Sequence, residues 1–244
     1  MNDTIALLLQ HRSIRKFTAD PLAPEQVGHI IAAAQHASTS SNMQAYSVIG
    51  VTDEAVKRQL AALAGNQGYI VECPLFLVWC ADLYRYAQAA GRHTDTPVTG
   101  NAENLIVATV DTALAAQNAA IAAESMGLGI VYIGGIRNQP DEVSALLKLP
   151  ELVYPVFGMC VGVPDQEPLS RPRLPEQAVY HSQAYNTEGQ AEAIDAYDQT
   201  IAQYMRERTR GKIATSWSKE MAAKAARPRE HMRAFLQKMG FGLE

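Results

Sequence analysis

A chain of 244 residues that is 48% hydrophobic and 19% charged has the composition of a globular protein with one or two buried cores. Its formal net charge of −4 disfavours nucleic acid and anionic membranes as general partners, and no apolar run approaches the roughly 18–20 residues that span a bilayer. The amino terminus lacks the pattern of a signal peptide and the three cysteines lie in or beside apolar runs, so we expect a cytoplasmic protein without disulfides.

Helix and strand signals alternate over the first 65 residues. Pro24 begins a predicted helix with apolar residues at helical spacing, and a polar stretch at residues 38–42 leads into a predicted strand at residues 46–51. Asp53 caps the next predicted helix. Residues 75–80 form a continuous apolar run, which indicates a strand in the middle of its sheet.

A long alanine-rich helix is expected over residues 103–126, after an exposed loop at residues 85–102. Its apolar positions are spread around most of the circumference, so the helix is buried by the fold or by another subunit. The small alanines favour a subunit interface for part of it. Strands are predicted at residues 130–133 and 156–162, with a short helix near residues 142–147 between them.

Residues 164–186 contain four prolines and predict an extended arm, and beyond residue 190 the pattern is helical. The apolar stripes there lie within residues 194–205 and 232–239. We therefore expect an α+β protein with a central mixed sheet of about four or five strands flanked by helices. The expected organisation is a core over residues 1–190 and a helical carboxy-terminal extension of the same domain over residues 191–244.

The segment His11-Arg12-Ser13-Ile14-Arg15 places two arginines three residues apart, with a serine between them. On a helix end or an adjoining turn, Arg12 and Arg15 would project to one side, and their planar groups suit phosphate oxygens. A small hydroxyl beside them can supply another hydrogen bond. The alternative interpretation of this segment alone is a solvated basic turn.

Three further features could bind an anion. Gly134-Gly135 directly follows a predicted strand and would let backbone N–H groups approach a ligand, unless it is a plain turn. Arg171 and Arg173 flank a proline in the irregular arm. A basic patch follows near a predicted helix end, made up of Arg206, Arg208, Arg210 and Lys212. For the arm and the patch, solvated surface charge is the alternative.

Metal-binding and conventional proton-transfer motifs are missing from the sequence. The histidines and cysteines show no metal-ligand spacing, so we expect no metal site, and neither G-x-G-x-x-G after a strand nor G-x-S-x-G occurs. Glu103 and Glu124 on the long helix are expected to form an exposed edge rather than an acid–base pair. This pattern fits chemistry performed by a bound cofactor, with no catalytic side chain.

Eight segments, in order along nearly the whole chain, match one known family. They are residues 11–17, 37–44, 65–67, 111–113, 116–118, 124–129, 131–138 and 172–175. Through them the chain resembles the nitroreductase family, in particular its branch of oxygen-insensitive NADPH nitroreductases and NADPH–flavin oxidoreductases. The resemblance implies the nitroreductase-like FMN-binding fold, with FMN held at the interface of a homodimer.

The resemblance also implies a role for each candidate site residue. The phosphate, ribityl chain and pyrimidine edge of FMN would contact His11, Arg12, Ser13 and Arg15. The isoalloxazine ring would contact Gln67 and Tyr69, and backbone near its N5 atom, where the chemistry takes place, would come from Ile133, Gly134 and Gly135. Arg171 and Arg173 would complete the cationic grip, and the second protomer would contribute Ser38, Thr39, Ser40 and Ser41. The 2′-phosphate of NADPH would be held by Arg208 with Arg210 or Lys212.

The activity that the resemblance implies is a ping-pong reaction. Hydride would pass from NADPH to FMN, and a nitroaromatic, a quinone or free flavin would then be reduced by two electrons. One alternative is an FMN-binding storage or sensor protein without turnover, although such a protein needs no second nucleotide site around Arg208. Another is an interaction module in which the long helix is merely a dimer seam.

Overall fold

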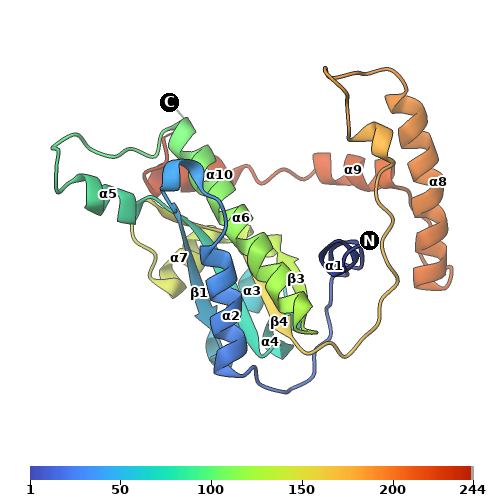
Figure 1. Ribbon diagram of the computed structural model, residues 1–244, viewed down its shortest axis with the longest axis horizontal. Coiled ribbons are helices and arrows are strands. Elements are labelled where there is room, and N and C mark those ends of the chain that lie inside the picture. The colour runs from blue at the N-terminus through green and yellow to red at the C-terminus, as the bar shows by residue number, and fades with distance from the viewer. Residues whose placement is uncertain (243–244) are drawn as a thin grey trace. The chain divides into compact units, whose positions relative to one another are not determined.

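A four-stranded sheet organises the first part of the chain in the computed structural model, which describes residues 1–242 (Figure 1). The strand order is β1-β2-β4-β3. The strands are β1 (Tyr46–Val51), β2 (Leu75–Asp82), β3 (Gly129–Ile133) and β4 (Val153–Gly162). In the register of the two central strands, Trp79 of β2 lies opposite Phe157 of β4. The expected α+β class is thus confirmed.

The sheet is antiparallel rather than mixed, which corrects one detail of the expectation. Within residues 1–242, each named strand pairs antiparallel with its neighbours. β2 and β3 run in the same direction and are connected through the long helix, but β4 lies between them and pairs with both. The parallel contact that the structure contains is a single bridge between Ser13 and Ile130.

Two helices cover one face of the sheet: α2 (Pro24–Gln35) and α6 (Ala102–Ser125). The face of α6 that packs into the core consists of alanines with at most 1% of their surface exposed: Ala115, Ala116, Ala119, Ala120 and Ala123. Contrary to the expectation, α6 is long and apolar enough to cross a membrane by length and composition alone. Its alanine face packs against β2, β4 and α2, as expected for a core helix.

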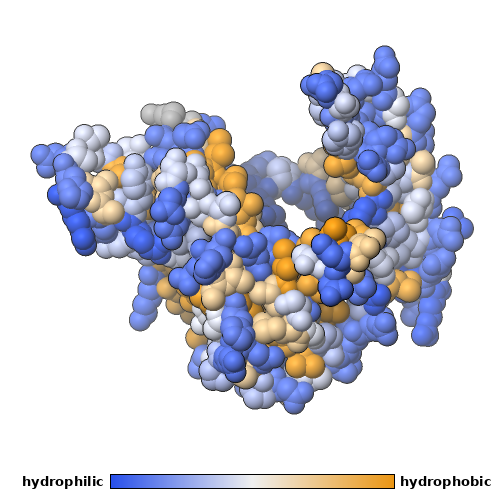
Figure 2. All heavy atoms as spheres, viewed as in Figure 1, coloured by the Kyte–Doolittle hydropathy of each residue, from blue (hydrophilic) through white to orange (hydrophobic). Residues whose placement is uncertain are grey.

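The opposite side of α6 carries an apolar stripe that no element among the described residues covers. Ile106, Val110 and Leu114, spaced four residues apart, are 58%, 49% and 44% exposed. Helix α1 (Asp3–Leu9), which contacts α6, also exposes Ile5, Leu8 and Leu9. Figure 2 shows hydrophobic residues at the surface over the amino-terminal half of α6 and over α1. Within residues 1–242, these apolar surfaces of α6 and α1 are therefore left exposed to solvent.

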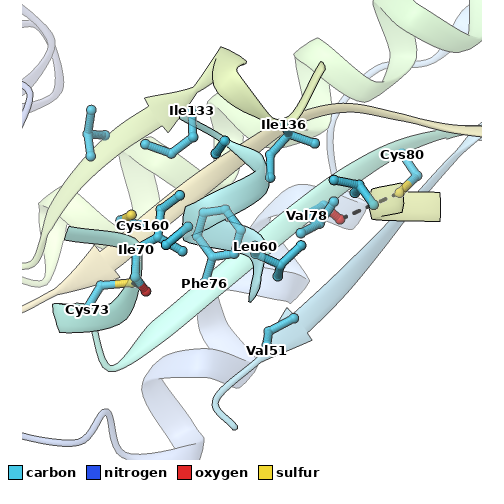
Figure 3. Packing of buried hydrophobic residues seen from close by; sticks show 14 of the residues in the cluster. Val51, Leu60, Ile70, Cys73, Phe76, Val78, Cys80, Ile133, Ile136 and Cys160 are labelled. Carbon is cyan, nitrogen blue, oxygen red and sulfur yellow. Dashed lines mark hydrogen bonds between the residues drawn. The ribbon is translucent and has the colours of Figure 1, made fainter. Parts of the chain in front are cut away.

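The other face of the sheet packs against α3 (Glu54–Leu63), α4 (Tyr69–Glu72) and α7 (Pro140–Leu147). Phe76 of β2 is fully buried there between Leu60 and Ile70, as Figure 3 shows. Near the carboxy terminus, α10 (His231–Lys238) adds Phe235 to a third cluster with Tyr154. The sheet is therefore covered on both faces.

A helix stands where the sequence predicted an exposed loop. Helix α5 (Tyr84–Ala90) begins after Asp82, whose Oδ1 accepts a hydrogen bond from the backbone N–H of Arg85 at 3.1 Å. Three alanines, which are strong helix formers, lie in the helix before Gly91 ends it. The loop was predicted from Gly91, Pro97 and Gly100, all of which follow this helix in the sequence.

Residues 169–229 form a separate compact unit, whereas the first unit comprises residues 1–168 and the described part of 230–244. The second unit contains the 3₁₀ turn η3 (Glu176–Ala178), helix α8 (Gln190–Thr209) and helix α9 (Trp217–Ala225), the last of which the sequence did not predict. Its core consists of Tyr197, Ile201, Tyr204 and Met205. The contacts thus divide the chain at residue 168, and the expected domain boundary at residue 190 stays a prediction.

The packing against Phe76 predicts a stability effect at one glycine. A Cβ atom at Gly158 of β4 would overlap the ring of Phe76. Because Phe76 is fully buried, its ring has no free space in which to move aside. Gly158→Ala should lower the free energy of unfolding by about 1–3 kcal/mol, measured by urea denaturation. Gly28→Ala is the matched control, because a Cβ there meets nothing within 4 Å on helix α2; it should raise stability by about 0.5–1 kcal/mol. Equal effects of both substitutions would contradict this packing.

Candidate functional site

The arginine segment lies outside helix α1, which ends at Leu9. It runs beside the sheet instead: the backbone N–H of Ile14 donates to Ile130 O of β3 at 2.9 Å, and Phe17 bridges to Pro164. Neither the helix end nor the adjoining turn that was expected for the two arginines is formed at residues 11–16, which are extended. Arg12 lies beside Glu167, whereas Arg15 lies beside Tyr69. The two arginines therefore belong to two separate groups of residues and do not form one binding pair.

Arg12 belongs to a cavity of about 360 Å³ that is also lined by His11, Glu124, Gly129 and Glu167. His11 Nδ1 lies 2.6 Å from Glu124 Oε1, and an Arg12 guanidinium nitrogen lies 3.4 Å from Glu167 Oε1. The Nε atom of Arg12 is buried, and no hydrogen bond to it is formed by the residues that the structure describes. The cavity therefore contains one guanidinium group with an unused Nε donor, beside two carboxylates.

Glu124 was expected on an exposed edge, and this prediction is wrong. Its side chain is 12% exposed because the carboxyl end of α6 packs against the arginine segment, where His11 is its partner. A carboxylate at this distance orients the imidazole ring by accepting a hydrogen bond from it. We therefore add Glu124 to the candidate site as the group that orients His11.

Arg15 belongs to a second group of residues, together with Gln67, Tyr69 and Gly135. The hydroxyl of Tyr69 donates to Gln67 Oε1, and Gln67 Nε2 donates to Ala64 O at 2.6 Å. Burial raises the pKa of the Tyr69 hydroxyl, while the nearby positive charge of Arg15 partly opposes the shift. The structure thus brings together residues that the sequence placed around one ligand.

Gly135 is the position at which the backbone comes closest to this group. It lies in the 3₁₀ turn η2 (Gly134–Arg137), directly after Ile133 ends β3. A Cβ atom at Gly135 would overlap both Gln67 Nε2 and Ala64 O, whereas a Cβ at Gly134 would meet only the Arg137 guanidinium, at 3.5 Å. Gly135 is therefore required for packing, and the backbone at Gly134 stays approachable.

Residues 38–45, called the 38–45 loop below, carry the predicted hydroxyl run. Ser38, Ser40 and Ser41 are exposed. Among the described residues, no hydrogen bond is formed by the four hydroxyls of residues 38–41. The loop backbone is fixed by Asp111 of α6 and Arg85 of α5, two residues to which the sequence analysis gave no role. An acidic residue on the buried alanine face of a helix was the available signal for Asp111.

The remaining candidate residues lie in the second unit. Arg171 forms an ion pair with Glu220 Oε2 at 3.1 Å. Arg208 lies in the last turn of α8, Arg210 follows it in a left-handed conformation with φ 51°, and Arg208, Arg210 and Lys212 are all exposed. For these three cations, no ion pair is formed within residues 1–242. Their grouping with the residues of the first unit, and that of Arg171 and Arg173, stays a prediction.

Comparisons with known proteins find the same family along the chain. Residues 8–163 match the model of the Nitroreductase family and residues 171–244 match that of the Nitroreductase family, C-terminal domain. The chain is 47% identical to the FMN reductase (NADPH) of Bacillus subtilis, over 99% of each chain, and 44% identical to the NADPH-flavin oxidoreductase of Vibrio harveyi, over 98% of each. Its structure resembles that of NfrA1 of B. megaterium, with a TM-score of 0.94 and 46% identity over 98% of this chain and 99% of that one.

Proposed function

Because the chain belongs to the nitroreductase family, we propose that it is a cytoplasmic, homodimeric, FMN-dependent NADPH oxidoreductase. Its oxidants are nitroaromatics, quinones or free flavin, and NADPH and the oxidant react in turn in a ping-pong sequence. The observation that carries the proposal is the grouping of Arg15, Gln67, Tyr69 and Gly135, which are distant in sequence and meet in the fold.

The donors of the candidate site fit FMN. A phosphate group needs cations and hydroxyl donors. Arg12 offers a buried Nε, and the 38–45 loop offers hydroxyls, that make no hydrogen bond to any residue the structure describes. A flavin ring needs hydrogen-bonding groups along its polar edge, and Gln67 supplies an amide there. The approachable backbone at Gly134 suits the ring near N5. The two carboxylates of the cavity are already engaged, Glu124 by His11 and Glu167 by Arg12, and the exposed Glu167 side chain can turn away from a bound phosphate.

Each residue then has a separate task in the reaction. Bound FMN would supply a two-electron carrier that takes hydride from NADPH and passes it to the oxidant. Arg15 would place positive charge beside a ring that gains electron density, which would favour reduction. The hydroxyl of Tyr69, whose pKa burial raises further, donates to the Gln67 amide oxygen and holds the amide in one orientation. The protein thus binds and orients, and no side chain is assigned as the acid or base.

The exposed stripe on α6 supports the homodimer. Ile106, Val110 and Leu114 form an apolar face on a helix whose other side is already buried. A second copy of α6 would cover this face, because residues spaced four apart form a continuous ridge for helix packing. The same association would bring the hydroxyls of the 38–45 loop, which lack partners in one chain, to the site of the partner subunit.

The activity is tested by mixing the FMN-loaded protein with NADPH under anaerobic conditions. We expect the yellow flavin absorbance to bleach, and to return when a nitroaromatic, a quinone or free FMN is added. Protein that stays yellow would instead be an FMN-binding storage or sensor protein. Protein that takes up no FMN would contradict the proposal altogether.

Arg15→Ala should weaken FMN binding by about ten- to a hundredfold, because a charged hydrogen-bond donor is lost from the ring edge. The dissociation constant is measured on apoprotein by quenching of flavin fluorescence. Arg58→Ala is the matched control, since Arg58 is an exposed arginine on α3 that pairs with Glu54. Unchanged FMN affinity in the Arg15 variant would remove Arg15 from the site.

Arg208→Ala should raise the KM for NADPH by about tenfold or more and leave the KM for NADH nearly unchanged, because one charge-assisted contact to the 2′-phosphate is lost. Steady-state kinetics with both nucleotides measure the difference. Arg227→Ala, at another exposed arginine of the second unit, provides the control. An equal rise for both nucleotides would exclude Arg208 from 2′-phosphate recognition.

A further inference from the structure

The 38–45 loop holds a costly backbone conformation. Ser41, Asn42 and Gln44 have φ values of 47°, 58° and 51°, in the left-handed region that disfavours residues other than glycine. Such conformations persist where surrounding contacts impose them, and they concentrate at functional sites. In this loop the imposing contacts come from one buried carboxylate and one guanidinium.

Asp111 of α6 is the buried carboxylate. It has no exposed surface, and its two oxygens accept hydrogen bonds from two backbone N–H groups of the loop: Ser40 N to Oδ1 at 2.9 Å and Ala45 N to Oδ2 at 3.1 Å. No cation pairs with Asp111 among the residues that the structure describes. Its charge is therefore satisfied by the loop backbone, which ties both ends of the turn to the helix.

Arg85 of α5 binds backbone carbonyl groups where the 38–45 loop ends and β1 begins. One terminal nitrogen donates to Gln44 O at 3.2 Å and to Tyr46 O at 3.1 Å. The other donates to Ser47 Oγ at 2.7 Å and to Asp82 Oδ2 at 3.2 Å. Asp111 thus binds two N–H groups of the loop, and Arg85 binds the carbonyl of Gln44 at its end and that of Tyr46 at the start of β1, so the backbone is held in one conformation before any ligand arrives.

With the backbone fixed in this way, the hydroxyls of residues 38–41 are left for a ligand. We propose that Asp111 and Arg85 are positioning residues that hold these hydroxyls ready to bind the phosphate of FMN, and thereby set the preference of the protein for FMN over riboflavin. The inference rests on the proposed function. It also gives a functional reason for the left-handed residues: a loop that is already ordered loses less conformational entropy when it binds FMN.

An amide at position 111 cannot replace the carboxylate. In Asp111→Asn one oxygen becomes an NH₂ group, which would face a backbone N–H of Ser40 or Ala45 instead of accepting from it. Arg85→Gln removes the carbonyl contacts from the exposed side of the loop, where the arginine is 58% exposed, so the variant should fold. The matched controls are Glu103→Gln, at an exposed position of α6, and Arg58→Gln on α3.

The experiment compares the dissociation constants of FMN and riboflavin for the apoprotein, measured by fluorescence quenching in wild type, the two variants and the two controls. We expect Asp111→Asn and Arg85→Gln to weaken FMN binding by about tenfold while riboflavin binding changes by less than about twofold, because the affected hydroxyls contact the phosphate. The controls should retain the wild-type preference. Circular dichroism checks that each variant is folded.

Two results would overturn the inference alone: an unchanged FMN preference in both variants, or an equal loss of FMN and riboflavin affinity, which would indicate a merely structural role. If Asp111→Asn does not fold, Arg85→Gln decides, since it loosens the same loop from the exposed side. Wild-type apoprotein that binds no FMN would overturn the proposed function itself and the inference with it, so the two failures can be told apart.

Discussion

The close packing of the alanine face of α6 is the constraint on which the first unit depends. Because Ala115 and Ala119 carry a single methyl group and are fully buried, the helix lies close to the sheet and to α2. Thr112 adds a hydrogen bond from its hydroxyl to Cys80 O of β2 at 3.2 Å. With α6 fixed, Asp111 faces the 38–45 loop and Glu124 faces His11. One helix therefore organises two parts of the candidate site and exposes an apolar stripe.

The residues grouped around Gln67 act through positive charge and hydrogen bonds. Arg15 supplies a guanidinium group, and the hydroxyl of Tyr69, whose pKa burial raises, holds Gln67 through a hydrogen bond. A site of this kind has no acid matched to one oxidant. Its selectivity would come from the space above the ring and from the charge around it, which suits the range of oxidants proposed.

Local structure could be predicted from the sequence, whereas pairing between distant residues could not. The apolar runs predicted each strand to within three residues at either end, and the alanine pattern predicted α6 to within one, because burial leaves a local periodic signal. The position of β4 between β2 and β3 depends on pairing between segments far apart in the sequence, which leaves no local periodic pattern. The family resemblance anticipated the grouping of Gln67, Tyr69 and Gly135. It did not reveal that Asp111 binds Ser40, which is 71 positions away in the sequence, or that Glu124 binds His11, which is 113 positions away.

The position of the 38–45 loop has a thermodynamic consequence. If this loop completes the site of the partner subunit, as proposed, every FMN molecule contacts both chains, and cofactor binding and subunit association become linked equilibria. Flavin then stabilises the dimer by mass action, and dilution that separates the subunits releases flavin as well. The fraction of protein carrying its cofactor thus depends on total protein concentration, so the amount of enzyme in the cell sets its degree of activation as well as its abundance.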